Sequence, residues 1–251
     1  MFNPQYMIND DASKAVISDL QLAQLNLQGY EFESRLLLPR IGGLSSVEEF
    51  ENLPHKDKEQ LMKESNDFMI HTYIKYVTRR HFDMLIDGGD FIFNLNQSKM
   101  DFLKKNTSIH KLFDTIKGFK ESYLIIGNHE WKDLNAYLKY FKKVVPYLWY
   151  YDKREEEYVI YTHYPLTKEI ILPGSPSEIL SELTGYECDL NDKFICNLYN
   201  DFRTEDFLNT KVRNIHGHVH SKGIPEDRKL DNVRYENVCL DYLIKTKRID
   251  V

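Results

Sequence analysis

Apolar residues follow two different patterns along the first part of the chain. Short continuous apolar runs are typical of buried strands, and longer stretches with an apolar residue every three or four positions are typical of amphipathic helices. The runs predict strands at 15–18, 83–90 and the beginning of 122–130. The longer period predicts helices over 57–80, 98–117 and 131–143.

The pattern changes after residue 143. Residues 144–151 and 157–164 are strand-like and flank the charged sequence DKREE, which predicts a hairpin. Residues 176–208 are predicted to be mostly helical, and the strand-like segments 212–218 and 232–245 follow. Alternating strands and helices followed by hairpins predict an α/β sandwich built on mixed sheets.

We expect one domain over residues 1–251, because the chain contains no repeat, low-complexity tract or linker. Residues 25–56 show no clear period, and a segment of that length in a compact domain is functional or disordered. No apolar stretch approaches the roughly 18–20 residues of a membrane span, and the N-terminus lacks the features of a signal peptide. We therefore expect a cytoplasmic protein with no membrane partner.

The cysteine spacing and the net charge exclude some classes of protein and disfavour others. Three cysteines, Cys188, Cys196 and Cys239, have no close-paired spacing, which excludes a disulfide framework and a zinc knuckle and favours buried thiols. The formal net charge of −6 argues against a general nucleic-acid binder, which usually carries a basic face.

Five apolar strands end in clusters of side chains that can bind metal. Five of the nine histidines fall in these clusters, and residues at strand ends converge on one edge of a sheet. The clusters are Asp19 with Gln21, GGD at 88–90, GNHE at 127–130, THY at 162–164 and HGHVH at 216–220.

Each cluster alone also has an ordinary structural interpretation. Asp19 and the GGD segment are typical of turns, and Asn128 is a residue type that adopts left-handed backbone. A lone His163 is compatible with a hydrogen-bonded core imidazole. HGHVH is compatible with a solvated strand edge, although alternation places its three histidines, including His216, on one face of an extended segment.

Together and in this order, the clusters resemble the calcineurin-like metallophosphoesterase superfamily. Its pattern is Asp-x-His, Gly-Asp, Gly-Asn-His-Asp/Glu, His and Gly-His-x-His, and the resemblance runs from about Ile17 to Asp241. It implies two mixed β-sheets packed as a sandwich and flanked by helices, with the segments 25–56 and 172–210 inserted as walls of a pocket.

The resemblance implies a centre of two divalent metal ions, bridged by Asp90. The other ligands would be Asp19, Gln21 and His220 at one ion, and Asn128, His163 and His218 at the other. Oxygen and imidazole ligands without thiolates suit Mn²⁺, which we expect first, with Fe, Zn²⁺, Mg²⁺ and Ni²⁺ as alternatives.

The same resemblance implies a role for His129, and the sequence offers further candidates for contact with the substrate. His129 would stabilise the transition state or protonate the leaving oxygen. Asn94 and Arg40 are weaker candidates for substrate contact. Lys56 and Arg203 could also reach a phosphate, although solvated surface charge is the simpler interpretation of each cation.

Gln21 departs from the family pattern, which usually has histidine there. A neutral amide is a weaker donor than imidazole, so it should lower the affinity for the ion that Asp19 and His220 would also bind. It should also favour Mn²⁺ or Mg²⁺ over Zn²⁺ at that position. A minority branch, the manganese-dependent ADP-ribose and CDP-alcohol pyrophosphatases, also carries glutamine at that position.

The implied function is hydrolysis of phosphoester bonds. The sequence GDFIFNLNQ lacks the arginine that Ser/Thr protein phosphatases carry after Gly-Asp. We expect a phosphodiesterase or phosphatase acting on a nucleotide or another small phosphoester. The alternatives are a nucleic-acid-processing nuclease, which the acidic balance opposes, and a catalytically impaired metal-binding interaction protein, which only Gln21 favours.

Overall fold

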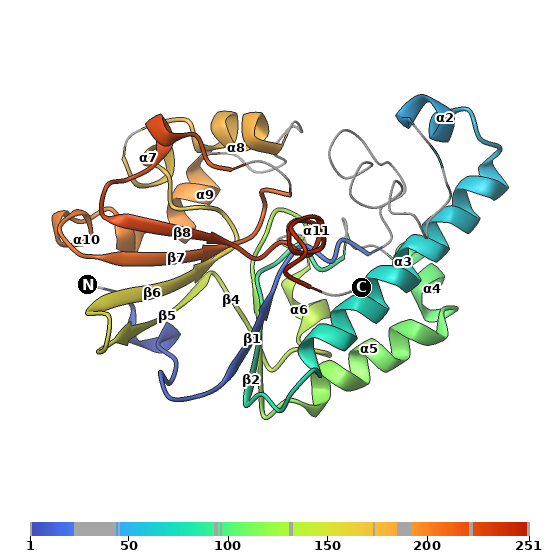
Figure 1. The fold of residues 1–251 in the computed structure, drawn as a ribbon, viewed down its shortest axis with the longest axis horizontal. Helices are drawn as coiled ribbons and strands as arrows, with labels where there is room; N and C mark the ends of the chain where they lie inside the picture. The colour runs from blue at the N-terminus through green and yellow to red at the C-terminus, as the bar shows by residue number, and fades with distance from the viewer. Residues whose placement is uncertain are drawn as a thin grey trace.

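The computed structural model describes residues 2–22, 44, 46–92, 95, 97–130, 133–172, 174–184, 192–220 and 223–249. Two four-stranded sheets pack face to face, and helices cover the outer face of each sheet (Figure 1). The predicted α/β sandwich is therefore confirmed.

Among the described residues, the strands of the first sheet are all parallel, in the order β1-β2-β3-β4. Its strands are β1 (Lys14–Ile17), β2 (Met84–Asp87), β3 (Glu121–Ile125) and β4 (Lys143–Val145). Parallel neighbours need a crossover connection, and helices occupy the stretches between these strands. The prediction that both sheets are mixed is wrong for this one, because its described strands are joined by connections that contain helices and pair in parallel.

The second sheet is mixed, with the order β5-β6-β7-β8. Its strands are β5 (Tyr147–Asp152), β6 (Glu157–Thr162), β7 (Val212–His216) and β8 (Val233–Asn237). The predicted hairpin is the antiparallel pair β5 and β6, and the other two pairs are parallel.

The helices form two outer layers. The layer on the first sheet contains α3 (His55–Val77), α4 (Gln97–Lys104), α5 (Thr107–Gly118), α6 (Leu134–Tyr137) and α11 (Leu240–Lys245). The layer on the second sheet contains α7 (Lys168–Ile171), α8 (Pro176–Thr184), α9 (Asp192–Leu198) and α10 (Glu205–Leu208). The remaining elements are α2 (Val47–Glu51), which precedes α3, and the short 3-10 helices η1 (Pro4–Tyr6), η2 (Asn200–Phe202) and η3 (Glu226–Arg228).

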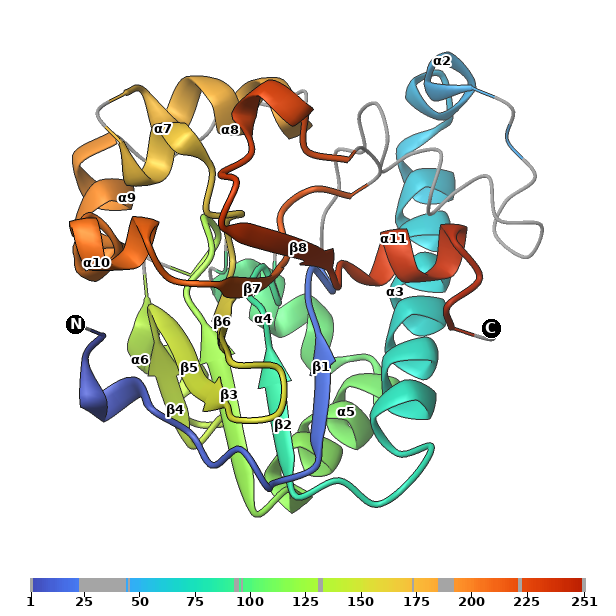
Figure 2. The ribbon, with the colours of Figure 1, turned by 60° about the vertical axis from the view of Figure 1, so that its left-hand side comes forward.

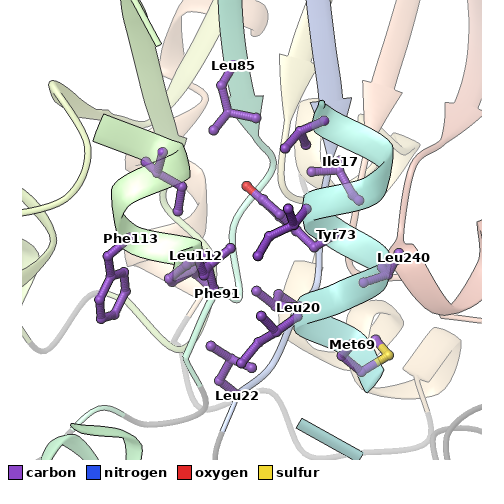
Figure 3. Packing of buried hydrophobic residues seen from close by; sticks show 14 of the residues in the cluster. Ile17, Leu20, Leu22, Met69, Tyr73, Leu85, Phe91, Leu112, Phe113 and Leu240 are labelled. Atoms are coloured by element: carbon purple, nitrogen blue, oxygen red, sulfur yellow. The ribbon is translucent and has the colours of Figure 1, made fainter. Parts of the chain in front are cut away.

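Alternate residues of the central strands face different layers. Leu85 of β2 packs with Tyr73 of α3 and Leu112 of α5, as Figure 3 shows. Its neighbour Ile86 faces the other way and packs with Ile215 in the core between the two sheets. Because β2 is buried on both faces, its sequence is a continuous apolar run rather than an alternating one.

Two predicted helices are shorter than the sequence pattern indicates. The helix predicted over 98–117 is divided between α4 and α5, since the Asn106 side chain accepts a hydrogen bond from Ser108 N and begins a new helix. In the segment 131–143, the described helix is only α6, and β4 begins at Lys143.

Two predicted strands also differ. The strand predicted over 144–151 is divided at Pro146 into β4 and β5, which belong to different sheets. The strand-like segment 232–245 ends as a strand at Asn237 and continues as α11, which buries Leu240, Leu243 and Ile244. Among the described helices, none combines the length and apolar character needed to cross a membrane.

Candidate metal centre

Loops that follow five strands bring the predicted ligands together. Asp19 and Gln21 follow β1, Asp90 follows β2, and Asn128 follows β3. His163 follows β6, whereas His218 and His220 follow β7. All of these side chains are buried. Backbone hydrogen bonds join the loops, with Asp19 N donating to Gly89 O and Gln21 N to Asp90 O at 2.9 and 2.8 Å.

Residues with left-handed backbone are concentrated in the loops that carry the predicted ligands. Asp19, Gln21, Asp90 and His218 have φ angles of 59°, 45°, 54° and 65°. These four are among six non-glycine residues with positive φ in the described part of the chain. A left-handed conformation costs a non-glycine residue about 1–3 kcal/mol, and such residues cluster at functional sites, where the surrounding structure holds them in place.

Two glycines allow the loops to approach one another. A Cβ atom at Gly127 would collide with the Asp90 carboxylate, and one at Gly217 would collide with Ser18 and the Asp19 carboxylate. Glycine at both positions therefore lets the backbone pass directly beside the two acidic side chains.

The predicted ligands form a first group, which consists of Asp19, Gln21 and His220, and a second group, which consists of Asp90, Asn128, His163 and His218. The His163 Nδ1 atom donates to the Gly88 carbonyl oxygen at 2.8 Å, so the lone pair of the neutral ring is on Nε2. That Nε2 atom lies 3.4 Å from Asp90 Oδ2, 3.3 Å from Asn128 Oδ1 and 3.2 Å from His218 Nδ1. The ligand atoms of Asp90, His163 and His218 all lie within 4.8 Å of one another.

The electrostatics of the second group favour a positive charge. Burial alone would lower the pKa of His163, yet the Asp90 carboxylate raises it to about 10. Burial alone would raise the pKa of Asp90, but the His129 and His163 rings hold it well below its usual range. Burial and the charge of His163 lower the pKa of His218. A divalent cation would supply the same positive charge and leave the imidazoles neutral.

The first group consists of Asp19, Gln21 and His220. The His220 Nδ1 atom lies 3.0 Å from Asp241 Oδ2, and its Nε2 atom lies 3.6 Å from Asp19 Oδ1. Asp19 Oδ2 accepts hydrogen bonds from the Ser18 hydroxyl and, at 3.1 Å, from the Cys239 thiol. These two donors hold the Asp19 carboxylate with Oδ1 toward His220.

The amide of Gln21 presents its nitrogen to the centre. Gln21 Nε2 lies 3.0 Å from His220 Nε2, so the amide acts as the donor to that ring. A half-turn about the last side-chain bond would exchange the amide nitrogen and oxygen, and only the oxygen can bind a metal. The role of Gln21 as a ligand therefore stays a prediction.

His129 lies at the border of the second group. Its Nε2 atom is 3.0 Å from Asn128 Nδ2 and 3.6 Å from Asp90 Oδ2. Because the Asn128 amide nitrogen donates to His129, the Asn128 oxygen points toward His163. Asn128 thus offers a metal its oxygen in the orientation that a ligand needs.

Two residues support the centre through contacts that the sequence motifs do not indicate, although one of them, Glu130, belongs to the GNHE cluster. Glu130 accepts hydrogen bonds from the backbone N–H groups of Asp90, Phe91 and Gly127 at 2.9, 2.8 and 2.9 Å, which ties the β2 and β3 loops together. Burial and the charge of Asp90 raise the pKa of Glu130 to about 8. Asp241 has no metal-binding pattern around it, and its contact with His220 arises only in the folded chain.

Other predicted residues are not part of the centre or are not described. Arg40 and Asn94 lie outside the described residues. Lys56 is exposed in the first turn of α3. Arg203 donates to the Ile170 carbonyl oxygen at 2.8 Å and to the Cys196 thiol, so its guanidinium is held within the layer of α7 and α9.

The prediction that His216 shares a face with His218 and His220 is wrong. Its Nδ1 atom lies 2.9 Å from Gly217 O, and its ring lines a separate cavity beside Tyr235. Alternation of faces requires extended backbone, and the left-handed φ of 65° at His218 interrupts it.

A solved structure has a fold similar to that of this chain. No family model matches it, and no curated protein matches it. The crystal structure of a protein of unknown function from Aquifex aeolicus is similar, with a TM-score of 0.50 and 16% sequence identity over 92% of each chain. At this identity the similarity concerns the fold alone.

Proposed function

We propose that the protein is a metal-dependent hydrolase of phosphoester bonds, of the calcineurin-like type, with two divalent ions bridged by Asp90. The observation that carries this proposal is the position of Asp90, which belongs to the second group and is hydrogen-bonded through its backbone to the first group. Its Oδ2 atom faces His163 of the second group, and its backbone oxygen accepts from Gln21 of the first group. The buried oxygen and imidazole donors fit Mn²⁺, the ion that we expect first.

Asp19, Gln21 and His220 would hold one ion, and Asn128, His163 and His218 the other, each with Asp90. When bound, two such cations supply Lewis-acid polarisation of a phosphoryl group and a water molecule of lowered pKa. The side chains of both residue groups would hold these cations in position. Their buried, hydrogen-bonded arrangement requires little reorganisation during the reaction.

His129 is the residue proposed to act on the leaving group. Its ring borders Asp90, and its side chain is about as buried as that of Asn128. To act as the acid, the ring must carry a proton at Nε2 and so release the hydrogen bond that Nε2 accepts from Asn128 Nδ2, and that proton would then pass to the leaving oxygen as the ester bond breaks. The substrate class that we propose is a nucleotide or another small phosphoester.

A panel of phosphomonoesters, phosphodiesters and dinucleotide pyrophosphates tests this proposal. Each compound is incubated with the full chain and Mn²⁺, Mg²⁺ or Zn²⁺, and products are measured by phosphorus NMR. We expect hydrolysis of at least one class, its loss with a chelator and its recovery with Mn²⁺. Single-stranded DNA and RNA are included in the panel, and cleavage of these alone would favour the nuclease alternative. Failure to hydrolyse any compound, although both ions bind, would contradict the proposal.

Gln21→His is expected to lower the free Mn²⁺ concentration that gives half-maximal activity. Imidazole is a stronger donor than an amide. A ten-fold change in the Mn²⁺ concentration corresponds to about 1.4 kcal/mol of binding free energy. The turnover rate need not rise. Both proteins are measured at one pH, because histidine must be deprotonated to bind. Gln60→His, on the exposed side of α3, is the matched control. Coinciding midpoints for wild type and Gln21→His would show that Gln21 is not a ligand.

A further inference from the structure

The segment that follows β8 packs directly behind the first group. β8 leads into α11 beside the end of β1 (Figure 2). Leu240 N donates to Ser18 O at 2.9 Å, and the Asn237 side chain donates to Val219 O. These bonds connect the segment 237–241 to the loops that carry Asp19 and His220.

Asp241 contacts His220 from within this segment. Its Oδ2 atom lies 3.0 Å from His220 Nδ1, and the exposed fractions of the two side chains are 0% and 6%. An ionised carboxylate can only accept, so the contact places the imidazole proton on Nδ1 and the lone pair on Nε2. The same ring directs Nε2 toward Asp19 Oδ1 and the Gln21 amide.

The hydrogen-bond partner of the Nδ1 atom differs between His163 and His220. His163 in the second group donates its Nδ1 proton to a neutral carbonyl, that of Gly88. His220 in the first group faces a carboxylate instead. A carboxylate partner makes an imidazole a stronger metal donor than a carbonyl partner does. The carboxylate partner is therefore in the first group, where an amide, that of Gln21, takes the place of an imidazole.

We propose that Asp241 is a positioning residue of the metal centre. It holds His220 in the Nδ1-protonated tautomer, directs Nε2 to the first ion, and raises the donor strength of the ring where Gln21 weakens the ligand set. This inference rests on the proposed function only for the presence of the first ion, and not for the reaction that the ion supports.

The test compares wild type with Asp241→Asn and Asp241→Ala in the full chain. Nitrogen-15 NMR in the presence of a chelator reports the tautomer of His220, and calorimetric titration with Mn²⁺ reports the affinity of each ion. Asp201→Asn is the control, because Asp201 accepts from the Tyr147 hydroxyl on the side of η2 and the second sheet.

In wild type and the control, we expect the Nδ1-protonated tautomer and two bound ions. Asp241→Ala should give a mixture of His220 tautomers and weaken the binding of one ion by about 10–100-fold, the usual effect of removing such a partner. Asp241→Asn, whose amide oxygen still accepts from Nδ1 without a charge, should weaken the same ion by about ten-fold. Circular dichroism checks the fold of each variant.

Wild-type affinity for both ions in Asp241→Asn would overturn the proposal, even if Asp241→Ala fails to fold. An unchanged tautomer in folded Asp241→Ala would overturn it as well. The proposed function fails separately. If wild type binds two ions and Asp241 controls one of them, but no phosphoester is hydrolysed, the inference stands and the proposed reaction is wrong.

Discussion

Asp90→Asn is expected to reduce phosphoester hydrolysis by about 10³-fold or more and to lower the bound Mn²⁺ from two ions to one or none. In the proposed centre, the Asp90 carboxylate would be the one ligand that both ions share. Losing several kcal/mol of metal-supported charge stabilisation corresponds to a rate loss of that size. Metal content is measured by mass spectrometry, and rates are measured with saturating Mn²⁺.

Asparagine suits this test because it preserves the local structure. Asp90 has a φ of 54°, a conformation that asparagine tolerates, and an asparagine Oδ1 can still accept from His129 N as Asp90 Oδ1 does at 3.1 Å. Asp201→Asn, which removes a carboxylate away from the centre, is the matched control. Two bound ions and full activity in Asp90→Asn would rule out the bridging role.

His129→Ala is expected to retain both ions and to slow turnover by about 10²–10⁴-fold, the usual contribution of a general acid. The loss should be smaller for a nitrophenyl ester, since a nitrophenolate leaves without a proton. Rates are compared on esters with good and poor leaving groups. An equal loss on both would instead indicate that His129 stabilises charge in the transition state.

A second variant separates proton transfer from the orientation of Asn128. The Asn128 amide nitrogen donates to His129 Nε2 at 3.0 Å, so His129 also holds the Asn128 oxygen toward His163. In His129→Gln, the side-chain oxygen can accept the same bond but cannot serve as an acid near neutral pH. We expect His129→Gln to be nearly as slow as His129→Ala. Recovery to the wild-type rate would mean that His129 only orients Asn128.

The strands and the clustering of polar side chains at their ends could be predicted because both depend on local sequence. Continuous apolar runs such as the one before Gly88 indicate strands buried on both faces. The carboxyl ends of parallel strands meet at one edge of a sheet, so Asp19 and Asp90 were expected close together, and their loops are hydrogen-bonded in the structure.

The remaining features depend on contacts that local sequence does not contain. Leu240, Leu243 and Ile244 have helical spacing, but such a short apolar segment fits a strand equally well until it packs. Asp241 meets His220 only after β8 and α11 have docked beside β1. The orientation of the Gln21 amide depends on His220, which is distant in the chain.

Crystals of the full chain grown with Mn²⁺ give the most direct test of the metal centre. An anomalous difference map identifies bound manganese without reference to any assay. We predict two peaks roughly 3.5–4 Å apart, the spacing of two-metal sites. Asp90 should contact both peaks, with Asp19 and His220 at one, and Asn128, His163 and His218 at the other. A single peak, or two peaks of which only one contacts Asp90, would contradict the account.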